Sequence, residues 1–165
     1  MKKRESPKNN PVDLQRAKEI AYNLLAAKSM SRYEMTTALK KRGVSDDDCA
    51  EIVEYLVEIR YLDDTAFARS LAVRLLRDKL YAPDKTLYEM SRRGIERRLA
   101  EKILEKLNYD IEAAISRIID KYGSRQPAKP EKIIAALNRH GFRYEEYAAL
   151  MREYIENTGR EEEDY

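Results

Sequence analysis

Apolar residues recur along the chain at the spacing of an α-helix, and their pattern repeats three times. Gly43, Gly94 and Gly141 mark the repeat, since each lies four residues after a long apolar residue and directly before another apolar residue. With the three segments aligned on these glycines, positions 6, 9, 10 and 13 residues downstream are apolar in every copy. Positions 26, 23, 22 and 19 residues upstream are apolar as well. Both sets follow the i, i+3, i+4, i+7 spacing of a helix with one buried face.

Each copy predicts three helices, of which the first is long and covers roughly residues 13–28, 64–79 and 110–122. The second helix begins at a capping box formed by Ser31 and Glu34, or at Pro83 and Pro130 in the later copies. It ends at the shared glycine, which supplies a left-handed residue. A third helix follows, and in the first copy it opens with the aspartates of residues 46–48, where negative charge is favoured.

The sequence therefore predicts an all-α protein built from three tandem three-helix repeats, at residues 12–63, 64–109 and 110–156. A repeat of this size is marginal alone, and stacking of consecutive repeats predicts an elongated molecule. We interpret residues 1–11 as a disordered basic tail and residues 157–165 as an acidic tail. Tyr33, Tyr61, Tyr81 and Tyr88 are predicted to lie at the junctions between repeats or at a partner surface.

Composition restricts the class of protein. The chain has 165 residues, 43% of them hydrophobic and 38% charged, with a formal net charge of +2, so it is not a globally basic nucleic-acid coat. It has no apolar run long enough for a bilayer and no apolar stretch after the basic residues near Met1, so we expect no membrane span and no secretory signal. One cysteine forms no internal disulfide, and we expect a cytoplasmic protein.

The residues for enzyme chemistry are scarce. The chain has one histidine and one cysteine, and it lacks a glycine-rich phosphate loop and any Cys/His cluster with metal-ligand spacing. We therefore expect no catalytic site, no metal and no cofactor. His140 is predicted to be an exposed surface residue and Cys49 a small buried one. The aspartates at 46–48 are interpreted as helix N-terminal residues rather than as a cation site.

The charge is unevenly distributed among the repeats. Residues 12–63 carry 8 basic and 10 acidic groups, residues 64–109 carry 11 and 7, and residues 110–156 carry 8 of each. The middle repeat is thus the electropositive one, and a basic patch there would attract phosphates or an acidic protein surface. The candidate residues are Arg69, Arg74, Arg77, Arg92, Arg93, Arg97, Arg98 and Lys102, with Lys40, Lys41 and Arg42 at the equivalent place in the first repeat.

A structural interpretation of these charges remains open. Glu101 is placed to pair with Arg97 or Arg98 along one helix, and Glu105 with Lys102. Basic residues near the end of a helix also interact favourably with its dipole. On that interpretation the patch is a solvated face without a partner.

Five short segments of the chain form a distinctive set: Ser31-x-x-Glu34-Met35, Leu39-x-x-x-Gly43, Tyr61-Leu62-Asp63-Asp64-x-x-Phe67-Ala68, Met90-x-x-x-Gly94-Ile95 and Lys121-Tyr122-Gly123. With these segments the chain resembles the RecX family, regulators of the RecA recombinase, over roughly residues 13–156. The chain departs from the family where it has Arg60 in place of a usual glycine, and in the stretch before Pro83, where a glycine is also usual.

This resemblance implies a curved molecule without enzyme activity that binds RecA filaments and inhibits their ATP hydrolysis, extension and strand exchange. The expected partners are the RecA filament and, through the basic patch, DNA; we expect a monomer that contacts no membrane. The alternative is a direct DNA-binding protein of the helix-turn-helix type with weak, non-specific affinity. The three aspartates that open the third helix of the first repeat argue against sequence-specific DNA reading, because they repel phosphate. A scaffold that binds some other protein is a third class.

Overall fold

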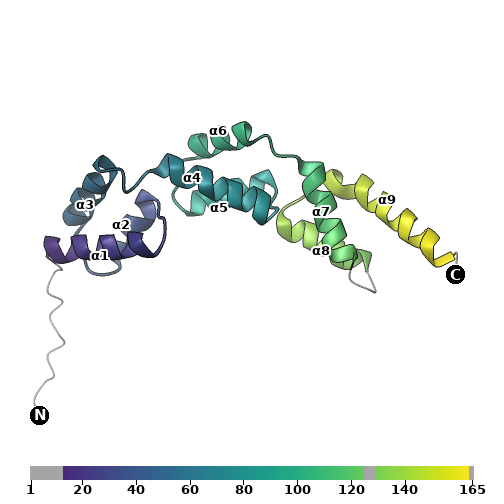
Figure 1. Ribbon diagram of the computed structural model, residues 1–165, viewed down its shortest axis with the longest axis horizontal. Helices are drawn as coiled ribbons and strands as arrows, with labels where there is room; N and C mark the ends of the chain where they lie inside the picture. The colour runs from purple at the N-terminus through teal and green to yellow at the C-terminus, as the bar shows by residue number, and fades with distance from the viewer. Residues whose placement is uncertain (1–12, 125–128, 164–165) are drawn as a thin grey trace, which may run out of the picture. The chain divides into compact units, whose positions relative to one another are not determined.

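The computed structural model describes residues 13–124 and 129–163, and within these residues every regular element is a helix (Figure 1). The helices form three sets of three, which confirms the predicted all-α repeat fold. The first set is α1 (Leu14–Ala27), α2 (Arg32–Lys40) and α3 (Asp46–Glu58). The second is α4 (Asp64–Val73) with its π-helical continuation η1 (Arg74–Asp78), α5 (Pro83–Arg92) and α6 (Arg97–Leu107). The third is α7 (Ile111–Gly123), α8 (Pro130–His140) and α9 (Tyr144–Glu163).

By its internal contacts the chain divides into two compact units. Unit 1 contains the residues up to Ala68 together with Arg93–Ile95, and unit 2 contains Arg69–Arg92 and the residues from Glu96 onward. The predicted repeat boundaries at 63/64 and 109/110 remain a prediction.

The residues predicted to start and end the second helices take these positions in the structure. Ser31 Oγ accepts from the Glu34 amide at 3.1 Å, and the Glu34 carboxylate accepts from the Ser31 amide at 3.2 Å, so the capping box is complete. Pro83 and Pro130 are the first residues of α5 and α8. Gly43, Gly94 and Gly141 have φ values of +83°, +77° and +91°, the left-handed conformation that favours glycine.

The core of unit 1 lies between α1, α2 and α3. The predicted stripes supply it: Ala17 and Ala21 from α1, and Cys49, Ile52, Val53 and Leu56 from α3, are all buried. Met35 and Leu39 of α2 are fully buried between them. Each such side chain contributes about 1.5–3 kcal/mol to folding by leaving water, so three short helices make a stable body only through this shared core.

The turn at Gly94 also belongs to unit 1, where it packs against the start of α2. Ser31 Oγ donates to the carbonyl oxygen of Arg93 at 2.6 Å. A Cβ atom on Gly94 would lie 2.1 Å from Cβ of Tyr33. Gly94 is thus required both by its φ angle and by the close approach of α2.

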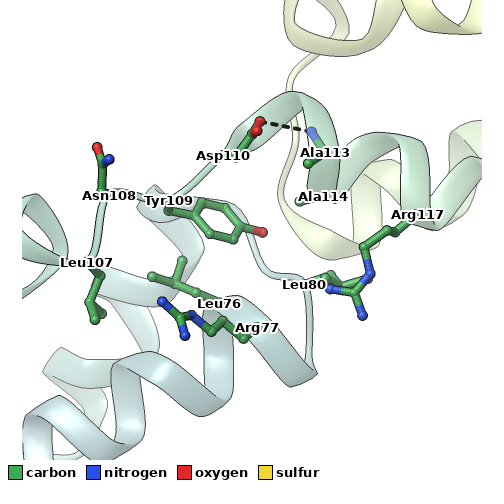
Figure 2. Close-up of a pocket in the computed structure, with 10 residues that line it drawn as sticks. All are labelled: Leu76, Arg77, Leu80, Leu107, Asn108, Tyr109, Asp110, Ala113, Ala114 and Arg117. Carbon is green, nitrogen blue, oxygen red and sulfur yellow. Dashed lines mark hydrogen bonds between the residues drawn. The ribbon is translucent and has the colours of Figure 1, made fainter.

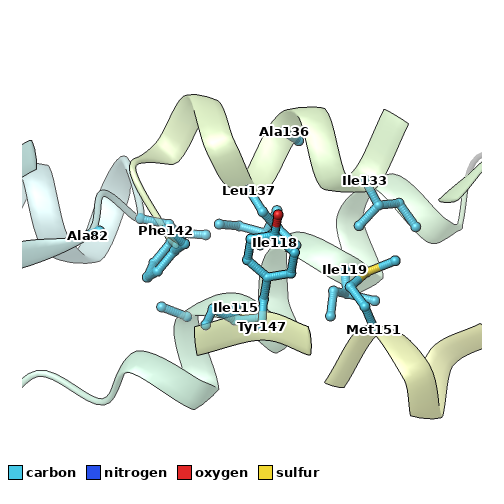
Figure 3. Packing of buried hydrophobic residues seen from close by; sticks show 12 residues of the cluster. Ala82, Ile115, Ile118, Ile119, Ile133, Ala136, Leu137, Phe142, Tyr147 and Met151 are labelled. Atoms are coloured by element: carbon cyan, nitrogen blue, oxygen red, sulfur yellow. The ribbon is translucent and has the colours of Figure 1, made fainter. Parts of the chain in front are cut away.

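In unit 2, α7 packs against both α8 and α9. Figure 3 shows their shared core, in which Ile115, Ile118, Ile133 and Leu137 are almost fully buried around Tyr147. The Tyr147 hydroxyl, at the polar end of this buried side chain, donates a hydrogen bond to Asn138 Oδ1 at 3.0 Å.

The turn at Gly141 is held in the same way as the turn at Gly94. The Ala82 amide donates to the carbonyl oxygen of His140 at 2.9 Å. The Lys85 ammonium donates to the carbonyl oxygen of Arg139, and a Cβ atom on Gly141 would lie 2.7 Å from Cβ of Lys85. Within each unit, therefore, the start of one second helix supports the glycine turn of the following repeat.

The structure differs from the sequence prediction in three places. The long helix predicted for 64–79 is α-helical only to Val73 and then becomes π-helical, with the Lys79 amide donating to the Arg74 carbonyl. The wider turn breaks the α-helical register that had placed Arg69 and Arg77 on one face. The helix α9 continues to Glu163, through residues assigned to the acidic tail, because glutamate favours helix. The tail at 1–11 lies outside the described residues.

His140 is the third difference, because it is half-buried rather than exposed. Its Nδ1 lies 3.1 Å from the carbonyl oxygen of Leu80, and its ring meets Tyr81 edge to face. Burial lowers the pKa of the imidazole, and the nearby Lys85 and Lys121 lower it further, against the opposing effect of the backbone hydrogen bonds. The sequence pattern did not reveal this contact because Leu80 and His140 are 60 residues apart.

Candidate partner-binding surface

Most of the predicted basic residues of the middle repeat are exposed side chains of unit 2. They lie on consecutive elements: Arg69 on α4, Arg74 and Arg77 on η1, Arg92 at the end of α5, and Arg97, Arg98 and Lys102 on α6. Two of them have acidic neighbours: Arg97 Nε lies 2.7 Å from Glu101 Oε1, and Arg92 lies 3.9 Å from Glu89. Such exposed helical pairs stabilise the fold by only about 0.3–0.5 kcal/mol, so they do not commit the arginines to a structural role.

Five side chains of this group have no acidic partner within 4.0 Å among the described residues. They are Arg69, Arg74, Arg77, Arg98 and Lys102. We call these five the free cations of unit 2. A positive side chain that is exposed and unpaired is available to an anionic partner at no cost in broken ion pairs.

Arg93 differs from the free cations because it is held by an acidic side chain. Its Nε and Nη2 atoms donate to the two Glu34 oxygens at 2.7 and 3.0 Å, and its guanidinium lies 4.9 Å from the centre of the Phe67 ring. Only 25% of the Arg93 side chain and 18% of the Glu34 side chain are exposed. Arg93 is therefore less accessible to a partner than the other predicted residues, because a carboxylate 59 residues earlier in the chain holds it, and its place in the patch stays a prediction.

The equivalent residues of the first repeat make mostly local contacts. Lys40 Nζ lies 2.8 Å from Asp46 Oδ1, and this hydrogen bond raises the pKa of the lysine. Arg42 donates to the Ala38 carbonyl oxygen at 2.8 Å, in the last turn of α2. Lys41 is exposed. For Lys40 and Arg42 the structure thus favours the helix-terminal interpretation.

A cavity of about 310 Å³ opens in unit 2 between η1, the loop at 107–110 and α7 (Figure 2). Arg77 and Arg117 border it from η1 and from α7. Tyr109 forms part of its wall, and the buried Tyr109 hydroxyl has no hydrogen-bond partner among the described residues. Burial raises the pKa of this phenol to about 12, although the charge of Arg117 opposes the effect.

Sequence reasoning found Arg77 but missed Arg117 and Tyr109. Arg117 lies in a repeat whose charges balance, and Tyr109 lies at the boundary between two predicted repeats. No local signal in the sequence links either residue to Arg77, because the cavity forms only when η1 and α7 pack together.

Within the described ranges no group of three or more His, Cys, Asp and Glu side chains is arranged to hold a metal ion. Cys49 is buried, as predicted, and burial raises the pKa of its thiol, which disfavours the nucleophilic thiolate. Across 13–124 and 129–163 no helix is both long enough and apolar enough to span a bilayer.

Comparison with known proteins gives one consistent result. Residues 17–56, which contain α2 and parts of α1 and α3, match the family model described as RecX, first three-helix domain. The regulatory protein RecX of Geobacillus kaustophilus is 28% identical over 158 residues, or 92% of this chain and 59% of that protein. The regulatory protein RecX of Prosthecochloris aestuarii is 27% identical over 150 residues, or 88% of this chain and 97% of that protein. The family model and these relatives agree in pointing to the RecX family.

The fold agrees with this assignment. The crystal structure of RecX from Lactobacillus salivarius superposes with a TM-score of 0.66 at 21% identity, covering 85% of this chain and 95% of that one. The chain spans only about three fifths of the length of the Geobacillus relative. The relatives are named as regulatory proteins.

Proposed function

We propose that this RecX-family protein is a non-enzymatic regulator that binds filaments of the RecA recombinase. It inhibits their ATP hydrolysis, their extension and strand exchange. The proposal places the protein in the cytoplasm, as a monomer. The observation that supports it most directly is the group of free cations on α4, η1 and α6. These five positive side chains have no acidic partner among the described residues and are available to an anionic surface.

Electrostatics fits such a function. A protein filament assembled on DNA carries phosphates, and exposed arginines attract phosphates as well as any carboxylates on the protein surface. Arginine is also better suited than lysine to this contact, because its planar guanidinium can bind a carboxylate or a phosphate with two parallel hydrogen bonds. Four of the five free cations are arginines.

The test is RecA's DNA-dependent ATP hydrolysis measured with increasing amounts of the protein. The wild-type chain is expected to slow hydrolysis at ratios up to one per RecA subunit. A variant with Arg69, Arg74, Arg98 and Lys102 replaced by alanine is expected to need at least tenfold more protein for the same inhibition. A control variant with Arg16, Lys28, Lys132 and Arg152 replaced by alanine loses the same four charges elsewhere and is expected to inhibit like the wild type.

Either of two results would contradict the proposal. One is unchanged hydrolysis at a large excess of wild-type protein. The other is equal loss of inhibition in the two variants, because the effect would then depend on net charge and not on the free cations.

Direct, weak DNA binding is the second candidate, and the exposed arginines of η1 and α6 favour it. Contacts with phosphate alone give an affinity that falls steeply with salt and is similar for all sequences. Titration of duplex and single-stranded DNA at two salt concentrations separates the two functions. Tight binding at physiological salt without RecA would make DNA the primary partner.

A further inference from the structure

The cavity of unit 2 is bordered by several energetically costly features. Leu80 and Asn108 both line it with left-handed backbones, at φ values of +53° and +47°. This conformation costs roughly 1–2 kcal/mol for a leucine, whereas asparagine adopts it more readily and Asn108 is the C-cap of α6. The Tyr109 hydroxyl is buried there without a partner among the described residues, at a cost of about 1–3 kcal/mol. The π-helical turn η1 forms another wall. Such features persist together mainly where a site requires them.

The rim of the cavity is positive. Arg77 and Arg117 are exposed, and neither has an acidic partner within 4.0 Å among the described side chains. The one carboxylate that lines the cavity, Asp110, already accepts a hydrogen bond from the Ala113 amide at 2.9 Å as the N-cap of α7. Two guanidinium groups are thus left to a ligand from outside.

The floor of the cavity is apolar. Leu76 and Leu80 are buried, with 1% and 7% of their surface exposed, and Leu107 lines the opposite side. In Figure 2 Leu76 and Arg77 lie below the Tyr109 ring, Leu80 and Arg117 lie to its right, and Leu107 lies to its left. The cavity is thus lined by apolar side chains and bordered by two positively charged ones.

We propose that this cavity binds a protein segment that carries an apolar side chain next to an acidic one. The apolar side chain enters between Leu76, Leu80 and Tyr109, and the carboxylate pairs with Arg77 and Arg117. A nucleic-acid strand fits less well, because its phosphates offer nothing to the apolar residues Leu76, Leu80 and Leu107 that line the cavity. The inference rests on the proposed function only in taking the partner to be a protein.

The probe is the blocked tripeptide acetyl-Glu-Leu-Glu-amide, followed by NMR of tyrosine-labelled protein, with Tyr109→Phe identifying the resonance of Tyr109. The peptide is expected to shift that resonance saturably, with a Kd in the millimolar range. Arg77→Glu combined with Arg117→Glu is expected to weaken binding at least tenfold, and so is acetyl-Gln-Leu-Gln-amide. The control pair Arg16→Glu and Arg152→Glu changes the same number of exposed charges and is expected to bind as the wild type does.

Three outcomes would overturn the inference. The first is no saturable shift with the peptide. The second is equal affinity in the Arg77/Arg117 variant, with circular dichroism confirming that it is folded. The third is tighter, arginine-dependent binding of inorganic phosphate or of oligothymidylate at the Tyr109 resonance, which would make the cavity a phosphate site.

The RecA assay keeps this inference separate from the proposed function. Peptide binding by a protein that leaves RecA hydrolysis unchanged would support the cavity and contradict the proposed regulation. Inhibition of RecA by a protein that binds no peptide would support the proposed regulation and contradict the inference about the cavity.

Discussion

Ser31 Oγ donates a hydrogen bond to the carbonyl oxygen of Arg93, at 2.6 Å, across 62 residues of sequence. The same hydroxyl accepts from the Glu34 amide at 3.1 Å, so one buried side chain both caps α2 and holds the next glycine turn. Ala82 and His140 occupy the aligned positions relative to their glycines, and there the Ala82 amide donates to the His140 carbonyl oxygen at 2.9 Å. The repeat thus preserves a contact while changing the group that makes it.

Ser31→Ala is expected to destabilise the protein by about 2–3 kcal/mol, because it removes an N-cap and takes from the partly buried Arg93 carbonyl oxygen its side-chain partner. Ser45 is the matched control, since it caps α3 through the Asp48 amide but is exposed and makes no contact of the Ser31 kind. Ser45→Ala is expected to cost about 1 kcal/mol. Urea denaturation of the two variants measures the difference, and equal losses would show that the Arg93 contact contributes nothing.

Gly94→Ala is expected to destabilise unit 1 by about 3 kcal/mol or more, because a left-handed alanine costs about 1–2 kcal/mol and its Cβ would also overlap Tyr33. Gly43→Ala is the control, because Gly43 has a similar φ of +83° but its Cβ position meets no such close neighbour among the described residues. It is expected to cost only about 1–2 kcal/mol. A thermal melt in which Gly43→Ala is the more damaging change would refute the close approach of α2.

Arg60→Gly is expected to stabilise the protein by roughly 0.5–1 kcal/mol, since Arg60 is exposed and left-handed at φ +61°. The RecX family usually has glycine at this place, so this chain keeps the backbone conformation without the residue that suits it. Lys41→Gly, at a helical φ of −60°, is expected to destabilise instead. If Arg60→Gly lowers the midpoint of chemical denaturation, the arginine side chain makes a compensating contact.

The stability of unit 2 is expected to fall as the pH drops below 6.5. Burial lowers the folded-state pKa of His140 below its ordinary value of 6.5, so the unfolded chain binds a proton first. The stability that the neutral His140 imidazole contributes is complete above pH 6.5, and it is lost as the pH falls from 6.5 to the folded-state pKa of His140. Because His140 is the only histidine, His140→Gln should abolish this slope between pH 7.5 and 5.5. A slope that persists in the variant would assign it to other groups.

Much of the fold is predictable because its signals are local. The glycine-anchored stripes, the Ser31 capping box, the helix-opening prolines and the left-handed glycines all depend on residues within about one helix of each other. The resemblance to RecX rests on the same short segments. What the pattern misses is the π-helical turn, since apolar spacing does not distinguish a wide turn from an α-helical one over so few residues.

The candidate surface is less predictable, because long-range contacts decide which charges are free. Arg92 and Arg93 are adjacent and chemically identical, yet Arg93 is held by Glu34 and Phe67 while Arg92 is exposed. Arg77 and Arg117 come together only at the cavity. Such differences follow from packing and leave no mark in the composition or spacing of the sequence.

The most direct test of the account is co-sedimentation of the purified chain with RecA filaments assembled on single-stranded DNA. The wild-type protein is expected to enter the pellet saturably, and the variant lacking Arg69, Arg74, Arg98 and Lys102 to bind at least tenfold more weakly. Absence of the wild-type protein from the pellet, even in excess over RecA, would contradict the central claim.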